Sequence, residues 1–453
     1  MRILFVDPAP RSGIVEPYEH LGLGYLCAAL GGKGYEVDTL SVPLQNLSAH
    51  RLVREIMKTD PHILGFSVKE INARRTFRLI RKLQSAGLNC HITLGGHFPT
   101  FNHARILHDF PEVDSVVRGE GEDTIVELMR ALADGGSLAG IPGLTYREGN
   151  NIRENPPRPL IEDLDRLPFP SRNMTPRVID QGGAIGLVAS RGCYANCSFC
   201  SIRSFYGTSS GPKWRARSPK HVVDEIEMLA SAFPGIPFKF ADDQFIGPGE
   251  RGKTWALNLA SEIRKRNLSV QFIVSCRVDA VEQDLFASLK EAGLKKVFIG
   301  VESGTQQGLD RFNKKTTVEQ NKRALKILEA VRVAYTIAFI FFDPYSTMED
   351  VKGNLEFLSD IRPYWHGKKG ILSIEPSITV HKGTPIEQRL RNDGQLLGDY
   401  LGYRYRIKDR RIQYVRFIVD FFIRRVMPTY HTLNLRGKTI RNRAHEFFHH
   451  VGN

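Results

Sequence analysis

The sequence has few cysteines and no long apolar run. Among its 453 residues there are 6 Cys, too few for the disulfide framework of a secreted domain. No apolar run reaches the roughly 18 residues that a membrane-spanning helix needs. The opening stretch, Met1 to Asp7, becomes acidic too soon for a signal peptide. These absences predict a cytoplasmic protein without a transmembrane segment.

The composition is that of a globular chain with two or three domains. Apolar residues make up 42% and charged residues 25%, which are ordinary values for folded proteins. The net charge of +14 is unevenly distributed. From Leu401 to Asn453 there are 12 Lys and Arg against 3 Asp and Glu. This basic region is either a solvated surface or a contact for an anionic partner.

The first 135 residues alternate short apolar runs with amphipathic stretches, as in a parallel sheet covered by helices. Strands are expected at Arg2–Val6, Glu36–Leu40, Ile63–Ser67, His91–Leu94 and Ser115–Val117. Helices are expected at Gly22–Gly32, Ala49–Lys58, Asn72–Ala86, Asn102–His108 and Gly121–Ala133. The pattern predicts an α/β fold with a flavodoxin-like, Rossmann-like sheet, whose ligands bind at the carboxyl ends of the strands.

The loops at that edge of the sheet predict a cofactor crevice. Glycines there let backbone approach a large flat ligand, and backbone amides can hold its polar groups. Taken singly, such glycines are also common helix caps. The candidate residues for binding the cofactor are Ser67, Gly95, Gly96, Glu120 and Gly121.

A hairpin and a proline-rich stretch follow the first domain. Ile141–Glu154 has a turn at Gly149-Asn150-Asn151, and prolines are frequent from Pro156 to Pro170, as in interdomain linkers. We therefore expect a first domain at residues 1–140 and a hairpin and linker at 141–184. A second domain is expected at 185–378 and a basic, helical C-terminal region at 379–453.

The second domain repeats the strand–helix alternation six times, which favours a partial parallel barrel over a second flat sheet. Strands are expected at Gly186–Ser190, Phe238–Ala241, Val270–Ser275, Val297–Val301, Thr336–Phe342 and Ile371–Glu375. Helices are expected at Pro219–Ala232, Gly249–Lys265, Gln283–Glu291, Val318–Val331 and Met348–Ile361.

Three cysteines follow the first strand of this predicted barrel, at the edge where such folds build active sites. Cys193, Cys197 and Cys200 have the spacing C-x3-C-x2-C, which suits one compact soft-metal centre. A zinc site would need a fourth ligand. A four-iron cluster usually takes four cysteines, so three would leave one iron free to bind another ligand. The other cysteines, Cys27, Cys90 and Cys276, are expected to be inert thiols among apolar neighbours.

With this cysteine motif, the barrel resembles the radical S-adenosylmethionine (SAM) superfamily, in which the open iron binds the amino and carboxylate groups of SAM. The resemblance covers the whole barrel and implies roles for its strand-end residues. Phe199 matches the aromatic position whose backbone lies near the adenine. Asp242 and Asp243 fall in the segment that holds the methionine amino group. Ser275, Arg277 and Glu302 end the next two strands and are expected to bind the cofactor.

The fifth strand departs from the superfamily pattern. It commonly ends in Gly-x-Pro, which leaves room beside the adenine, whereas Phe342 stands in place of the glycine here. Thr347 and Glu349 keep the start of the following helix recognisable.

The N-terminal domain resembles the cobalamin-binding domains that are fused to this superfamily. The matching segments are Leu21–Leu26, Gly95–His97, Val117–Glu122 and Leu164–Pro170. Asp60-Pro61-His62-Ile63-Leu64-Gly65 spells the motif of enzymes whose histidine binds cobalt, but in those proteins it follows the first strand. Here it enters the third strand at its amino end, so His62 is expected to be a turn residue.

Together the two resemblances imply a cobalamin-binding radical SAM enzyme with a [4Fe-4S] cluster, SAM and cobalamin. The implied reaction is C-methylation of an unactivated carbon through a 5′-deoxyadenosyl radical and methylcobalamin. A cyclisation or rearrangement without methyl transfer is the alternative. A sensor without chemistry would not need the cysteine cluster and the strand-end acids. Methylthio transfer to RNA would need a further cysteine trio, so a nucleic acid partner is not expected.

The substrate is not evident from the sequence, and small molecules, lipid-like molecules and peptides all remain open. An external electron donor such as flavodoxin or ferredoxin is expected. An amphipathic run, Tyr414–Met427, carries phenylalanines beside arginines. It is either a packed helix with a solvated basic face or a surface for a lipid-like or anionic substrate.

Overall fold

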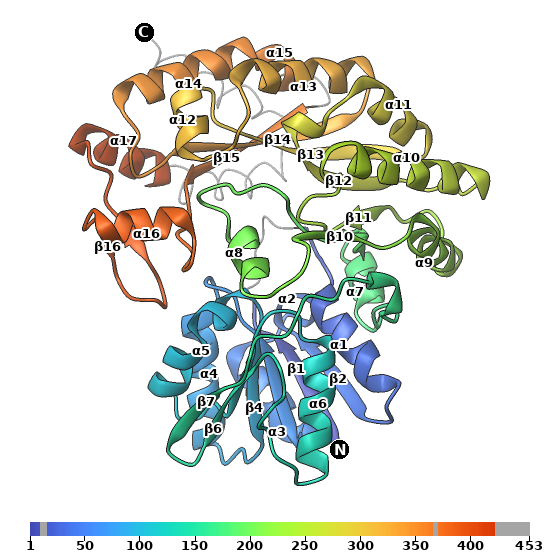
Figure 1. The fold of residues 1–453 in the computed structure, drawn as a ribbon, viewed down its shortest axis with the longest axis vertical. Helices are drawn as coiled ribbons and strands as arrows, with labels where there is room; N and C mark the ends of the chain where they lie inside the picture. The colour runs from blue at the N-terminus through green and yellow to red at the C-terminus, as the bar shows by residue number, and fades with distance from the viewer. Residues whose placement is uncertain (10–15, 366–369, 422–453) are drawn as a thin grey trace.

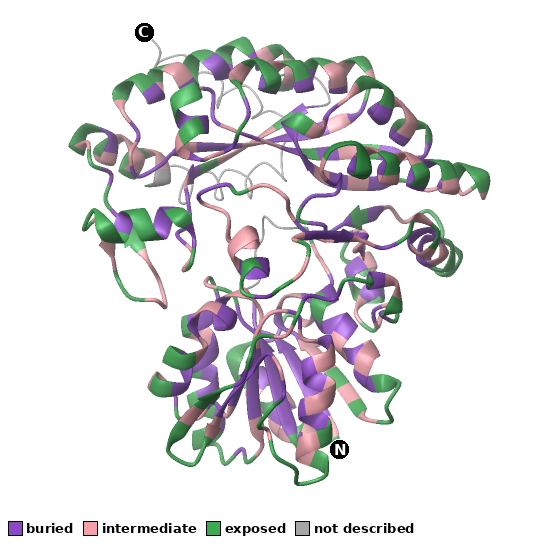
Figure 2. Ribbon diagram, in the orientation of Figure 1, coloured by how far each residue is buried: buried purple, intermediate pink, exposed green. Residues whose placement is uncertain are grey.

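The computed structural model describes residues 1–9, 16–365 and 370–421. Two sheets, one mostly and one wholly of parallel strands, are each covered by helices and lie one above the other with helix α8 (Ser201–Gly207) between them (Figure 1). Buried residues are concentrated in the strands of both sheets and in the helix faces turned toward them (Figure 2). Among the described residues, no helix combines the length and the apolar character needed to cross a bilayer.

The first sheet has seven strands in the order β2-β1-β3-β4-β5-β6-β7. Its strands are β1 Arg2–Asp7, β2 Glu36–Ser41, β3 Ile63–Ser67, β4 His91–Gly95, β5 Ser115–Val117, β6 Leu144–Glu148 and β7 Asn151–Glu154. The first five are parallel, in the predicted flavodoxin-like order. The expected hairpin is β6–β7, which extends this sheet in antiparallel pairing. The first sheet therefore continues past residue 140 to Glu154.

Helices cover both faces of the first sheet because its strands are apolar on both sides. The helices are α1 Leu21–Gly31, α2 Val42–Gln45, α3 Ala49–Thr59, α4 Ala73–Ser85, α5 His97–Asp109 and α6 Glu122–Ala133. Helices α1 and α6 pack on one face, and α3, α4 and α5 pack on the other. The α5 helix starts five residues earlier than predicted, since it begins directly after Gly96.

The second sheet is an open barrel of six parallel strands in the order β15-β14-β13-β12-β11-β8. Its strands are β8 Ile185–Leu187, β11 Phe238–Phe240, β12 Phe272–Arg277, β13 Leu294–Glu302, β14 Ala334–Phe342 and β15 Gly370–Ser377. The linker before it carries η1 Leu164–Arg166 and α7 Thr175–Asp180. The covering helices and turns are α9 Pro219–Ala232, α10 Gly249–Lys265, η2 Val278–Ala280, α11 Gln283–Glu291, α12 Gln306–Arg311, α13 Val318–Ala330, α14 Met348–Asp360 and α15 Arg362–Trp365. The six predicted strand–helix repeats are thus confirmed.

The predicted first barrel strand, Gly186–Ser190, is wrong in its extent. The barrel strand β8 ends at Leu187, and a separate strand, β9 (Ser190–Gly192), pairs antiparallel with β10 (Trp214–Ala216). A continuous apolar run gave no sign of this break, because the pairing of β9 with β10 depends on residues more than twenty positions away.

The C-terminal region adds α16 Pro385–Asn392, β16 Leu396–Leu397, β17 Arg404–Tyr405 and α17 Arg410–Phe421. These elements share an apolar cluster with the end of β14. The predicted amphipathic run Tyr414–Met427 is described as helix as far as Phe421. Its last six residues lie outside the described part of the chain.

Candidate active site

The three cysteines lie on the loop between β9 and α8. Cys193 follows β9 directly, and Cys200 is the N-terminal cap residue of α8. Gly192 makes this loop possible, since its φ is +85° and a Cβ there would lie 1.9 Å from the carbonyl oxygen of Lys213. The loop therefore begins where the β9–β10 pair brings two backbones close together.

The thiols are sheltered and have polar donors. Cys197 is buried, and Cys193 and Cys200 are half-buried. Arg277 Nη1 lies 3.4 Å from Cys197 Sγ, and the Ala195 N–H lies 3.4 Å from Cys193 Sγ. Burial raises the pKa of Cys193, and raises that of Cys200 to about 12. A metal centre would be needed to keep such thiols deprotonated.

The donor set fits an iron–sulfur cluster better than a single ion. The described residues contain no group of three or more His, Cys, Asp or Glu side chains arranged to hold one metal ion. A cluster instead binds each thiolate at a different iron, which suits three thiols spread along one loop. Cys276 belongs to the core between the barrel sheet and its helices, so it does not supply a fourth ligand. Cys27 is also buried and Cys90 is half-buried.

The two strand-end aspartates have different surroundings. Asp242 is buried and accepts hydrogen bonds from Ser190 Oγ at 2.5 Å and the Ala189 N–H at 3.2 Å. Burial raises its pKa to about 7. Asp243 is exposed within the cavity described below and accepts from the Gly192 N–H at 3.0 Å. Asp242 thus braces the β8–β9 turn, which leaves Asp243 as the aspartate open to a ligand.

Arg277 and Glu302 are each held by a neighbouring side chain. The Arg277 guanidinium donates to Asp279 at 2.9 Å and to the carbonyl oxygen of Lys314 at 2.5 Å. Glu302 accepts from Lys314 Nζ at 3.0 Å and has a φ of 68° where the pairing of β13 with β14 shifts register. Ser275, on the strand of Arg277, is half-buried. These contacts bring Arg277 to the cysteine loop and fix the carboxylate of Glu302.

The segment around Phe199 is attached to the end of α12. The Ser198 N–H donates to the carbonyl oxygen of Phe312, and Ser198 Oγ donates to that of Arg311, both at 2.8 Å. The rings of Phe199 and Phe312 meet edge to face, with centroids 5.2 Å apart. The position of the cysteine loop therefore depends on α12.

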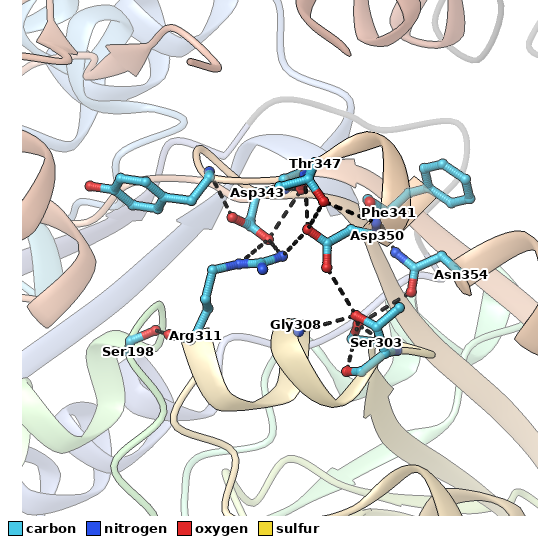
Figure 3. Close-up of polar contacts among 12 residues, drawn as sticks. Ser198, Ser303, Gly308, Arg311, Phe341, Asp343, Thr347, Asp350 and Asn354 are labelled. Atoms are coloured by element: carbon cyan, nitrogen blue, oxygen red, sulfur yellow. Dashed lines mark hydrogen bonds and ion pairs between the residues drawn. The ribbon is translucent and has the colours of Figure 1, made fainter. Parts of the chain in front are cut away.

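An ion-pair network holds α12 in turn, at the end of the fifth barrel strand (Figure 3). Arg311 pairs with Asp343 at 2.8 Å and with Asp350 at 2.9 Å. Thr305 Oγ1 lies 3.2 Å from Asp350, and Asn354 accepts from the Gly304 N–H at 2.8 Å. The network joins the ends of two barrel strands to α12 and α14.

The departure from Gly-x-Pro places Phe342 and Asp343 at the end of the fifth strand. Phe342 is fully buried in the apolar cluster shared with the C-terminal region. The next residue, Asp343, turns to Arg311. The large side chain at the glycine position thus belongs to the same apolar cluster against which Phe199 of the cysteine loop packs.

All five crevice residues predicted from the N-terminal domain line one cavity. Ser67, Gly95, Gly96, Glu120 and Gly121 lie around about 1120 Å³ of empty space, counting the part open to solvent. The barrel contributes the opposite wall, with Val188, Ser190, Arg191, Phe205, Tyr206, Ala241 and Asp243. One cavity therefore joins the carboxyl edge of the first sheet to the cysteine-bearing side of the barrel.

Glycines leave part of the crevice backbone without side chains, so that a large flat ligand can approach it closely. Gly96 has a φ of +103°, and a Cβ there would lie 3.1 Å from the carbonyl oxygen of Val68. Its neighbour Gly95 ends β4 on the floor of the cavity. The residues present therefore fit the edge of a corrin ring lying over the strand ends.

Two histidines in this cavity were not singled out from the sequence. His20 Nε2 lies 2.7 Å from Ser67 Oγ, and His20 Nδ1 accepts from the Leu23 N–H at 3.2 Å. The ring of His97 stacks on Phe205 at 4.0 Å, and burial lowers its pKa to about 4. Burial also lowers the pKa of His20. The position of His20 just before α1, on the same edge as Ser67, could have indicated it.

Glu120, predicted to bind the cofactor, lines the cavity and also connects the two domains with its carboxylate. It accepts from Arg191 at 2.9 Å, Arg215 at 2.8 Å and the Ile161 N–H at 2.7 Å. Glu122 accepts from Arg191 at 2.6 Å. Burial opposes ionisation of Glu120, but the two arginines outweigh it and lower its pKa. We call these four charged residues the Glu120 clamp.

His62 lies at the opposite edge of the first sheet, as predicted. Its Nδ1 accepts from the Arg2 N–H at 3.2 Å, beside the start of β1. Ser67, at the other end of β3, lines the cavity. The Asp-x-His-x-x-Gly string therefore does not bring its histidine to the crevice.

Comparisons with known proteins agree with this arrangement. Residues 14–129 match the B12 binding domain family, and residues 187–358 match the Radical SAM superfamily. An uncharacterised methyltransferase of Pyrococcus horikoshii is 30% identical over 79% of the chain and 77% of its own length. The anaerobic magnesium-protoporphyrin IX monomethyl ester cyclase of Rubrivivax gelatinosus is 29% identical over 80% of the chain and 66% of its own length. The solved structure of OxsB, a cobalamin-dependent radical enzyme, superposes with a TM-score of 0.81 at 21% identity, covering 99% of the chain and 70% of OxsB.

Proposed function

The chain belongs to the cobalamin-binding radical SAM enzymes, and we propose that it is a C-methyltransferase that acts on an unactivated carbon of its substrate. Its cofactors are cobalamin, SAM and a [4Fe-4S] cluster. The proposal goes beyond family membership in naming the type of reaction.

The observation that carries the proposal is the shared cavity. Gly95, Gly96 and Gly121 of the cobalamin domain line the same space as Asp243, which lies beside the cysteine loop. A methyl group must travel directly from its carrier to the carbon that receives it, so both cofactors must reach one substrate. A single cavity between the two domains meets this requirement.

When bound, SAM at the reduced cluster supplies a radical that abstracts hydrogen, and cobalamin supplies a methyl group. The protein's own residues hold and orient these groups. Cys193, Cys197 and Cys200 would hold the cluster, while Arg277 donates to the thiol of Cys197. Phe199, Ser275, Asp243 and Glu302 are proposed to contact SAM.

Apolar side chains make up a large part of the cavity wall. Phe5, Leu23, Tyr25, Leu94 and Phe205 line it with apolar surface. Such a lining protects a carbon radical from the solvent.

A cyclisation without methyl transfer is the second candidate, because the cyclase of Rubrivivax gelatinosus aligns with 80% of the chain. The methyltransferase of Pyrococcus horikoshii, aligned over a larger share of its own length, supports the first candidate. Either reaction needs a substrate and an electron donor, for which flavodoxin or ferredoxin would serve. Six free cysteines suit a reducing compartment, so we place the enzyme in the cytoplasm.

The ratio of products tests the proposal. Reconstituted enzyme is incubated with a strong reductant, methyl-deuterated SAM and a cell extract, and the molecule that gains the label is identified. A methyltransferase should release 5′-deoxyadenosine and S-adenosylhomocysteine in near-equal amounts, because one SAM serves as radical source and another as methyl source. A product that forms without label and without S-adenosylhomocysteine would establish cyclisation or rearrangement instead.

A further inference from the structure

Helix α17 is apolar on two opposite faces. On the inner face, Ile412 is fully buried, and Val415 and Val419 pack against the apolar cluster at the end of β14. On the outer face, Tyr414, Phe417, Ile418 and Phe421 are exposed by 66%, 65%, 44% and 56%. Their i, i+3, i+4, i+7 spacing places them in one stripe. An apolar face of this kind is normally covered.

This outer stripe differs from the other exposed apolar residues. The remaining large apolar side chains exposed in the described part of the chain lie on other elements, and at most two share one: Met348 and Leu355 on α14, besides Met1, Ile71, Met228, Phe298 and Ile371. Single exposed apolar residues are common and need no partner. A contiguous stripe on one helix marks an interaction surface. Helix α17 lies at the periphery of the barrel, next to α16 (Figure 1).

Positive charge precedes the stripe along the chain. Arg404, Arg406, Lys408 and Arg410 are exposed, and none of them forms an ion pair with a carboxylate among the described residues. Arg411 pairs with Asp409. The segment from Arg404 to Phe421 thus combines exposed aromatic and aliphatic side chains with four cations that form no ion pair among the described residues, which favours an anionic partner.

The positive charge of this segment favours one kind of partner over the others. A second copy of the chain would bring two such basic segments together, and like charges oppose that contact. The sequence of residues 422–453 adds six Lys and Arg but one Glu, so this segment would not neutralise the surface either. Nucleic acid would satisfy the cations, but single strands bind in grooves where bases stack, whereas this stripe lies along the outer face of a helix. A lipid surface takes both the apolar stripe and the cations.

We propose that α17 docks the enzyme on an anionic lipid surface, with Tyr414, Phe417, Ile418 and Phe421 in the headgroup region and the nearby cations against lipid phosphates. This docking does not depend on the type of reaction. It would hold the molecule at a membrane surface without a transmembrane helix.

Vesicle co-sedimentation of the full-length protein tests the docking. Vesicles of equal parts phosphatidylglycerol and phosphatidylcholine should bind the protein at about 0.1 M salt, and pure phosphatidylcholine should bind it more weakly. The double variant Phe417→Ser/Phe421→Ser should lower the partition coefficient at least about tenfold. Arg404→Gln/Arg406→Gln should lower it by about fivefold for each charge removed.

The control is Met228→Ser/Leu355→Ser, which removes two exposed apolar side chains from α9 and α14 and should bind vesicles like the wild type. Unchanged thermal unfolding of every variant would show that the fold is intact. Several results would overturn the proposal: no binding to phosphatidylglycerol vesicles, equal binding by the Phe417→Ser/Phe421→Ser variant, a wild-type dimer that this variant dissociates, or binding to single-stranded RNA with none to vesicles.

Discussion

Cys193, Cys197 and Cys200 belong to one sequence motif, but their thiols have different surroundings. Arg277 donates to Cys197, a backbone N–H donates to Cys193, and Cys200 occupies the N-terminal cap position of α8. Hydrogen bonds to a cluster's sulfur ligands influence its reduction potential. The guanidinium of Arg277 therefore contacts a cysteine of the cluster motif, in addition to the cofactor contact expected for it from the sequence.

The cluster assignment predicts that each of the three cysteines is needed for iron binding. Cys193→Ala, Cys197→Ala and Cys200→Ala should each abolish the about four irons per chain found after anaerobic reconstitution, because each thiolate holds a different iron. Iron and sulfide analysis and the low-temperature electron paramagnetic resonance of the reduced protein provide the measurement. Cys27→Ala, Cys90→Ala and Cys276→Ala are the matched controls and should keep the cluster. Full iron content in any of the first three variants would refute the assignment.

The antiparallel pair of strands β9 and β10 connects the cysteine loop with the cobalamin domain. β9 leads into the cysteine loop, and its Arg191 lies opposite Arg215 of β10 in the ladder. Both arginines reach Glu120 of the cobalamin domain. The β9–β10 pair thus connects the cysteine loop to the rim of the crevice.

Breaking the Glu120 clamp should destabilise the fold, while the three cysteine ligands of the cluster stay in place. Arg191→Met leaves Glu120 with one arginine and Glu122 with no partner among the described ion pairs. Loss of one member of a buried ion pair costs roughly 3–5 kcal/mol, so denaturant unfolding should show a loss of that order. Arg153→Met, which breaks an exposed pair with Glu148, should cost at most about 1 kcal/mol. A similar small cost for both variants would show that the Glu120 clamp is not structural.

For the whole molecule, the shared cavity means that cobalamin should order both domains. Bound ligand stabilises the state it binds, by about 2.7 kcal/mol when its concentration is about 100 times Kd. Hydrogen exchange should therefore slow around Gly95–His97 and also around Ser190–Gly192, since both segments line the cavity. Peptides from α10 and α11, on the outer layer of the barrel, should exchange as before. Protection confined to the first domain would mean that the barrel does not contact the cofactor.

The sequence alone determined the elements and the metal donors of this protein. Apolar periodicity predicted the five parallel strands of the first sheet and the six strand–helix repeats of the barrel, because periodicity reflects which faces of an element are buried. The cysteine trio was recognisable because its three ligands lie within eight residues. The position of His62 could be predicted because this residue directly precedes β3, and the end of a strand can be recognised from neighbouring residues in the sequence.

The tertiary structure decided which partner each charged side chain takes. Glu120 meets Arg191 and Arg215, 71 and 95 residues away, and Asp242 meets Ser190, 52 residues away. Sequence spacing carries no information about such pairs, because they form only when separate elements pack. For the same reason the two faces of α17 could be told apart only in the fold. Both faces are apolar in the sequence, and packing against the cluster at the end of β14 covers one of them and leaves the other exposed.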